Sequence, residues 1–218
     1  ILRNTGKEVI FNLSTRDMNK LALQSHLLGA QMLGLENLVV VQGDDFSERD
    51  LALLKPVNDF RPTTLMSALA SMNQGVDFRG SRLRAATDFN IGASIDLGRG
   101  MDAEAALAHR KAQAGAQFFI TQPIFSTGEI TAFQEAHLAL AGEEISQPVF
   151  FGLQVLVKDG VIFSNVPEGL RHDLEQGRDG TDIAQELLHQ FLGFGIRRIY
   201  LVPPILRGGA RDYQAAQR

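Results

Sequence analysis

The fold is indicated by a short apolar run, Asn37-Leu38-Val39-Val40-Val41-Gln42, which breaks at Gly43-Asp44-Asp45. Its central residues are apolar at consecutive positions, so both faces of a strand formed here would be buried. Strands of that kind occur in parallel sheets whose two faces are covered by helices. The run therefore predicts a buried parallel strand that ends in a turn.

The same pattern extends in both directions, because short β-branched or aromatic runs alternate with longer helical segments. Leu21, Leu28, Met32 and Leu35 recur at helical spacing and are expected to face the sheet. Six strands are expected, at residues 9–13, 37–42, 90–95, 118–122, 149–154 and 199–202. Helices are expected from the capping signal at 14–17 to Gly34, and over 62–75, 102–114, 127–140 and 182–194.

This alternation predicts an α/β fold of the (β/α)8 TIM-type barrel class, as a single domain over residues 1–218. About six βα units are present, whereas a closed barrel needs eight strands. A sheet of six would leave unpaired backbone groups at two edges. Since the chain also starts at Ile1 and not at Met, we expect a barrel that is incomplete at its N-terminus, with its first strands missing.

Composition excludes several classes of function. The chain has no cysteine, which rules out disulfides, thiolate zinc sites, iron–sulfur clusters and a catalytic thiol. Its net charge of -4 argues against nucleic acid as a partner. No apolar run approaches the roughly 20 residues that span a bilayer, so no membrane partner is expected. A cytoplasmic setting fits these features, and a homo-oligomer is compatible with them.

Polar residues gather where the expected strands end, which is where βα proteins bind ligands. Amides, hydroxyls, carboxylates and an arginine suit a polar heteroaromatic ring better than a hydrolytic metal site. The residues are Asn12, Ser14, Gln42, Asp44, Ser94, Asp96, Thr121, Gln122, Gln154 and Arg207.

Local alternatives remain open at these positions. Gln42-Gly43-Asp44 is also what a strand end followed by an Asx turn requires. Gln122 before Pro123 is also compatible with a structural amide that is satisfied inside the protein. The five histidines fall mostly within expected helices, so we expect them to be structural or solvated and expect no metal site.

Three stretches within about residues 9–217 follow a recognisable pattern. The first is Asn12-Leu13-Ser14-Thr15-Arg16-Asp17, with Gln42-Gly43-Asp44 one βα unit later. The second and most specific joins residues 110–116 to Phe119-Ile120-Thr121-Gln122-Pro123-Ile124-Phe125. The third is Tyr200-Leu201-Val202-Pro203-Pro204, with residues 207–213 after it. Together they resemble the methylenetetrahydrofolate reductase family: the first is similar to its strand end His-Leu-Thr-Cys-Arg-Asp, and the third to its last strand and helix.

The resemblance implies an oxidoreductase of one-carbon metabolism and methionine biosynthesis. Hydride would pass from NADH or NADPH through bound FAD to methylenetetrahydrofolate, giving methyltetrahydrofolate. It implies Asp44 and Gln122 as catalytic residues that also bind the folate, with Arg207 contacting folate or nicotinamide. The implied flavin contacts are Asn12, Gln42, Gly43, Asp44, Ser94, Glu104, Arg110 and Lys111, the last two suited to the pyrophosphate.

The chain departs from the family pattern at several positions. Asn12 replaces a histidine, Ser94 replaces a tyrosine, and residues 96–100 contain no histidine for the adenosine half of the flavin. The family's glutamate proton donor, on its first strand, has no counterpart in this sequence. Two alternatives therefore stay open: a relative that passes hydride directly from nicotinamide to folate without flavin, and a non-catalytic folate-binding or partner subunit.

Overall fold

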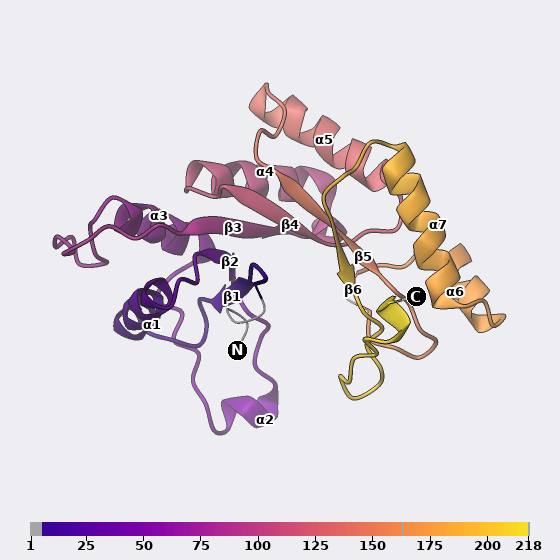
Figure 1. Cartoon of the computed structure of the whole chain (residues 1–218), viewed down its shortest axis with the longest axis horizontal. Helices are drawn as coiled ribbons and strands as arrows, with labels where there is room; N and C mark the ends of the chain where they lie inside the picture. The colour runs from indigo at the N-terminus through magenta and orange to yellow at the C-terminus, as the bar shows by residue number, and fades with distance from the viewer. Residues whose placement is uncertain (1–5, 163, 218) are drawn as a thin grey trace. The chain divides into compact units, whose positions relative to one another are not determined.

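A computed structural model describes residues 6–162 and 164–217 and confirms an α/β fold. Its six described strands follow one another along the sheet in chain order. This is the strand order that repeated right-handed βα units produce. The strands are β1 (Ile10–Ser14), β2 (Asn37–Val41), β3 (Asn90–Ile95), β4 (Phe118–Pro123), β5 (Val149–Gln154) and β6 (Ile199–Val202) (Figure 1).

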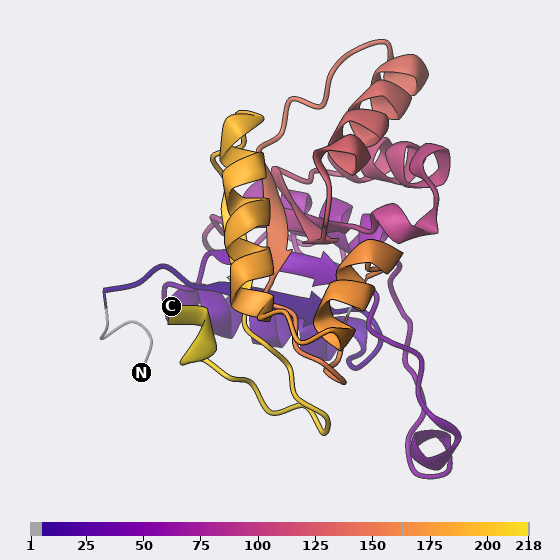
Figure 2. The same ribbon diagram turned by 90° about the vertical axis from the view of Figure 1, so that its right-hand side faces the viewer.

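Helices alternate with these strands (Figures 1 and 2). The longer ones lie close to their predicted positions, which confirms the sequence pattern for those segments. They are α1 (Lys20–Met32), α3 (Pro62–Asn73), α4 (Met101–Gln113), α5 (Thr127–Ala141) and α7 (Gly180–Gly193). The short elements α2 (Glu48–Leu51), α6 (Glu168–Glu175) and the 3-10 turns η2 (Leu97–Arg99) and η3 (Ala215–Gln217) were not predicted.

The chain divides into two compact units. The first unit contains the residues up to Ser94 together with Arg110–Phe119. The second unit contains Ile95–His109 and the residues from Ile120 onward. Each unit has strand ends of its own, so the polar residues are described below within the unit to which they belong.

In the first unit, β1, β2 and β3 pair in parallel, with Asn12 opposite Val39 and Val39 opposite Gly92. Leu38, Val39 and Val40 are all buried, as predicted for a strand covered on both faces. Gly92 leaves room for the ring of Phe118, because an added Cβ would lie 2.3 Å from Cζ of that ring. The core of this unit therefore needs a glycine at position 92 as well as apolar side chains around it.

In the second unit, β5 and β6 pair in parallel, from Phe151 opposite Ile199 to Gln154 opposite Val202. Helix α7 packs on β5 (Figure 1). Its first residue, Gly180, lies so close to the chain after β5 that an added Cβ would come within 1.7 Å of the carbonyl oxygen of Leu156. The start of α7 is thus fixed directly above the carboxyl end of β5.

The inward face predicted for α1 is wrong. Leu21 is 72% exposed and Met32 is 86% exposed, whereas Leu23, Leu27 and Ala30 are buried. Leucines occur on more than one side of this helix, and both sets have helical spacing. Periodicity alone could not choose between them. By contrast, α3 has a single apolar face, and Leu65, Met66, Leu69 and Met72 are fully buried.

The capping signal predicted for α1 is also wrong. The helix begins at Lys20, and the side chain of Asn19 accepts a hydrogen bond from the backbone N–H of Ala22 at 2.8 Å. Residues 14–17 end β1 and form a polar loop instead. Within the part of the chain that the structure describes, no helix combines the length and the apolar character needed to cross a membrane.

Candidate functional site

The strand-end loops of the first unit, residues 14–17 and 42–46, are held together by hydrogen bonds. The hydroxyl of Ser14 donates to the carbonyl of Gln42 at 3.3 Å, and the backbone N–H of Thr15 donates to the carbonyl of Val41 at 3.0 Å. Gly43 has φ +86°, and an added Cβ would lie 2.6 Å from Oγ of Ser14. Glycine is therefore required here both for its backbone conformation and for space.

Arg16 fixes the far side of these loops. Its Nε lies 2.6 Å from Oδ1 of Asp17, its Nη1 donates to the carbonyl of Asp44, and its guanidinium carbon lies 4.2 Å from the ring centre of Phe46. The hydrogen bond with Asp17 raises the pKa of Arg16, and the same bond lowers the pKa of Asp17. Arg16 thus bonds the backbone carbonyl of Asp44, and Asp44 itself is exposed in the loop after β2.

The residues implied as flavin contacts divide by exposure. Asn12, Gln42 and Arg110 are exposed, and Ser94 is half-buried. Lys111 is only 5% exposed, and its ammonium group donates to the carbonyl of Ser94. Glu104 is 1% exposed. The polar groups near β1 and β2 are thus accessible to a ligand, whereas Lys111 and Glu104 lie inside the protein.

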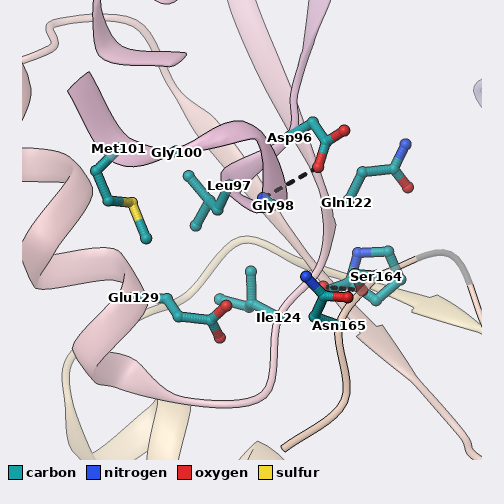
Figure 3. A pocket seen from close by; sticks show the side chains of 11 residues that line it. Asp96, Leu97, Gly98, Gly100, Met101, Gln122, Ile124, Glu129, Ser164 and Asn165 are labelled. Carbon is teal, nitrogen blue, oxygen red and sulfur yellow. Dashed lines mark hydrogen bonds between the residues drawn. The ribbon is translucent and has the colours of Figure 1, made fainter. Parts of the chain in front are cut away.

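The second unit contains a pocket of about 240 Å³, called here the second-unit pocket (Figure 3). Its walls come from the turn after β3, the end of β4, the first turn of α5 and the chain before α6. It combines apolar side chains with amides and carboxylates. The lining residues are Asp96, Leu97, Gly98, Gly100, Met101, Gln122, Pro123, Ile124, Glu129, Ser164 and Asn165.

The polar groups of the second-unit pocket differ in how many hydrogen bonds they make within the protein. Asp96 accepts from the backbone N–H of Gly98 at 3.1 Å and from Nε of Arg99 at 3.1 Å. Glu129 accepts from the backbone N–H groups of Phe125 and Ser126, at 3.0 and 3.2 Å, and so caps α5. These two carboxylates therefore have their main role in fixing the pocket walls.

The side-chain amides of Gln122 and Asn165 are available for hydrogen bonding in this pocket. Within residues 6–162 and 164–217, neither side chain makes a hydrogen bond to the protein. Each amide offers both donors and an acceptor. Beside the apolar surfaces of Leu97, Met101 and Ile124, such groups can bind a flat heterocycle or an amide that also carries donors and acceptors. Gln122 thus lines a pocket at the end of β4, and its role in binding stays a prediction.

Other predicted residues lie elsewhere. Arg207 is exposed in the turn after β6, where Ile205 and Arg211 form an antiparallel bridge, and it does not line the second-unit pocket. His137 is buried, with Nδ1 3.1 Å from the carbonyl oxygen of Glu143, which confirms a structural role for this histidine. No group of three or more potential metal ligands occurs among the described residues.

Ser164, Asn165 and Met101 were missed as pocket residues. The segment from Val155 to Pro167 has neither helical nor alternating periodicity, so the sequence gives no basis for placing it beside β4. The Ser164-Asn165-Val166-Pro167 sequence does signal a turn. A signal of that kind locates a loop but does not say which strand end the loop reaches.

The alternating βα order, with a pocket at a strand end, defines an α/β protein built from repeated βα units. Residues 1–156 match the family model described as "Methylenetetrahydrofolate reductase". The chain therefore belongs to the methylenetetrahydrofolate reductase family. The match ends at residue 156, so the resemblance of Tyr200–Pro204 to the family's last strand stays a prediction.

No curated protein sequence matches the chain. Among solved structures, it is similar to one described as "Uncharacterized protein from Clostridium thermocellum binds two copies of 5-methyl-5,6,7,8-tetrahydrofolic acid". The identity is 14%, the alignment covers 92% of this chain and 89% of that chain, and the TM-score is 0.44. At that TM-score the similarity carries no argument about ligand or function.

Proposed function

We propose that this protein reduces methylenetetrahydrofolate to methyltetrahydrofolate with NADH or NADPH, with FAD as its bound cofactor. The reaction consumes one hydride and one proton for each folate reduced. Family membership over residues 1–156 supports this class of reaction. The structural observation that carries the proposal concerns the Gln122 amide. This amide lines a pocket and makes no hydrogen bond within the described residues, so it is available to bind a ligand.

The second-unit pocket is the proposed folate site. Gln122 can donate to and accept from the edge of a pterin, which carries both kinds of group. Leu97, Met101 and Ile124 supply apolar surface for a flat ring. In the first unit, the exposed carboxylate of Asp44 is proposed to contact both the flavin and the folate. In the second unit, exposed Arg207 is proposed as a contact for folate or nicotinamide charge.

The donor set at the ends of β1 and β2 fits the ring of a flavin. Asn12 and Gln42 present exposed amides, Gly43 presents backbone without a side chain, and Asp44 presents a carboxylate. These groups would hold the polar edge of the ring, and a carboxylate there would influence its electronic properties. A bound flavin would supply a two-electron carrier between nicotinamide and folate. Ser94 and Arg110 are the further residues proposed to contact it.

A flavin-free reductase is the second candidate. Buried Lys111 donates to the carbonyl of Ser94, so its charge is used inside the first unit and is not presented to a pyrophosphate. Glu104 is likewise buried. Direct hydride transfer from nicotinamide to folate would need neither residue as a cofactor contact.

One experiment separates the candidates. The visible absorption spectrum of the complete protein is recorded before and after anaerobic addition of NADH or NADPH, followed by methylenetetrahydrofolate. A flavin band that bleaches with nicotinamide and returns with folate is the expected result. A colourless protein that still reduces methylenetetrahydrofolate would replace the first candidate by the second. Absence of turnover with both nicotinamides would reject both and favour a non-catalytic folate-binding or partner subunit.

The six strands are proposed to belong to a (β/α)8 barrel. Their sequential order is the order that such barrels have, and the second-unit pocket lies at the carboxyl end of β4, where barrel enzymes bind their ligands.

A further inference from the structure

The two backbone carbonyls that flank Gln122 each accept a hydroxyl from a different part of the second unit. The hydroxyl of Tyr200, on β6, donates to the carbonyl of Thr121 at 2.5 Å. The hydroxyl of Ser164, before α6, donates to the carbonyl of Pro123 at 2.5 Å (Figure 3). The backbone that carries the pocket amide is therefore held on both sides by side chains distant in the sequence.

Gly152 on β5 allows Tyr200 to reach β4. A Cβ at Gly152 would lie 2.8 Å from the hydroxyl oxygen of Tyr200 and 3.1 Å from Cα of Pro123, so no larger residue fits without displacing one of them. The backbone N–H of Gly152 donates to the hydroxyl of Thr121 at 3.0 Å, and its carbonyl accepts from the N–H of Ile124 at 3.0 Å. The strand end at Gln122 is thus also tied to β5 before and after the amide.

These contacts fix the backbone from which the Gln122 side chain projects. Its side chain makes no hydrogen bond to the protein within the described residues, so its direction depends on the backbone at 121–123 and on its rotamer. We propose that Tyr200 and Ser164 are positioning residues, which hold Gln122 in the orientation that binds the folate. This inference rests on the proposed function of the second-unit pocket.

Tyr200 is suited to this role because it stays a donor. Burial raises the pKa of its hydroxyl to about 12, so the group is protonated at any physiological pH. Each of the two hydroxyls donates to a backbone carbonyl of β4, and neither is proposed to touch the reacting carbon. Their removal should therefore act through Gln122 and not on the chemistry directly.

The test is a double-mutant cycle in the complete protein. Tyr200→Phe and Ser164→Ala each remove one hydroxyl, and each is measured alone and in a Gln122→Ala background. We expect each single change to lower kcat/KM for methylenetetrahydrofolate about tenfold. This is less than the roughly hundredfold cost of a 1 Å misplacement, because the other contacts of the strand end remain. In the Gln122→Ala background we expect no further loss, because the residue that they position is absent. Ser164→Thr, which keeps a hydroxyl, should retain most of the activity.

Matched controls remove hydroxyls that make no hydrogen bond to β4 within the described residues. Tyr213 is the only other tyrosine of the chain and is exposed, and the hydroxyl of Ser71 bonds within α3. Tyr213→Phe and Ser71→Ala should leave kcat/KM unchanged. The positioning role would be overturned if Tyr200→Phe and Ser164→Ala lowered kcat/KM as much in the Gln122→Ala background as in the wild type. It would also be overturned if neither single change had an effect.

A second measurement does not depend on turnover. The ¹⁵N relaxation of the Gln122 side-chain amide, recorded without ligand, should show a lower order parameter in Tyr200→Phe and Ser164→Ala than in the wild type and the controls. If the wild type neither binds nor reduces folate, the proposed function fails, and this measurement still decides whether the two hydroxyls order Gln122. An unchanged order parameter would reject the positioning role in either case.

Discussion

The strand-end loops of the first unit and the second-unit pocket both place polar side chains at the carboxyl ends of parallel strands, but they use them differently. In the first unit, Arg16 contacts Asp17, the carbonyl of Asp44 and the ring of Phe46, all close to solvent. In the second unit, Gln122 and Asn165 line a concave pocket beside apolar side chains. The first arrangement organises a loop, whereas the second leaves amides available to a ligand.

The two polar strand ends thus differ in how far they would remove a ligand from water. Exposed ion pairs contribute little to stability because water screens them and competes for them. When an amide is partly removed from water, the absence of its hydrogen-bond partner costs more free energy than it does at the surface. The affinity for folate should therefore depend more on the second-unit pocket than on the loops of the first unit.

The largest expected effect is on the stability of the second unit, at the start of α7. Gly180→Ala would bring a Cβ to within 1.7 Å of the Leu156 carbonyl oxygen, and should lower the free energy of unfolding by about 3 kcal/mol. Its matched change in the first unit is Gly29→Ala within α1, where an added Cβ meets nothing within 4 Å. That change should stabilise the protein by about 0.5–1 kcal/mol. Urea unfolding measures both, and equal effects would remove the structural contrast.

Ligand binding gives the next largest contrast. Gln122→Ala should weaken methyltetrahydrofolate binding by about tenfold to a hundredfold, the range that corresponds to the loss of about 1–3 kcal/mol for one hydrogen-bonding group. Asp44→Asn should lower turnover while changing the Kd less than about threefold, as expected for an exposed group. Calorimetric titration and steady-state rates measure the two, with Gln190→Ala on the exposed side of α7 as the control. A larger loss of affinity for Asp44→Asn would reverse the assignment of the two regions.

A smaller effect is expected at the second pocket amide. Asn165→Ala should raise the Kd for methyltetrahydrofolate by about fivefold, because Asn165 is exposed and its amide is only partly removed from water. Asn165→Asp keeps the size and one acceptor but loses the donors, so it should resemble Asn165→Ala if the amide donates to the ligand. Wild-type affinity in both variants would exclude Asn165 from the ligand contacts.

The smallest effects should appear at opposite ends of the pH scale. The Arg16 hydrogen bond lowers the pKa of Asp17 below its ordinary 3.8, so the stability it contributes is present above that pH and is lost as the pH falls through the lowered value. Burial raises the pKa of Tyr200 from 10.0 to about 12, so its contribution is present below pH 10 and is lost as the pH rises toward 12. The free energy of unfolding of Asp17→Asn, Tyr200→Phe and the wild type is measured as a function of pH. Asp17→Asn should weaken the pH dependence only at acidic pH, and Tyr200→Phe only at alkaline pH.

Strands were predicted well because the signal that defines them is local. The predicted bounds of β3 and β5 agree with the observed bounds, since a polar or turn-forming residue closes each apolar run. Helix faces were harder. α1 has leucines on both sides, so only packing against the sheet decided that Leu23 and Leu27 face inward. The short helices α2 and α6 lack an extended apolar stripe, so periodicity had nothing to detect.

The sequence by itself determined the βα order, the polar strand ends, the absence of cysteine chemistry and the place of Gln122 at the end of β4. These follow from patterns within a few residues, where side-chain spacing and turn chemistry act directly. Only the tertiary structure decided that Ser164 and Tyr200, 41 and 79 residues from their acceptors, bond to the carbonyls beside Gln122. Contacts of that range depend on how strands and loops meet in space, and no local pattern specifies which distant hydroxyl reaches a given carbonyl.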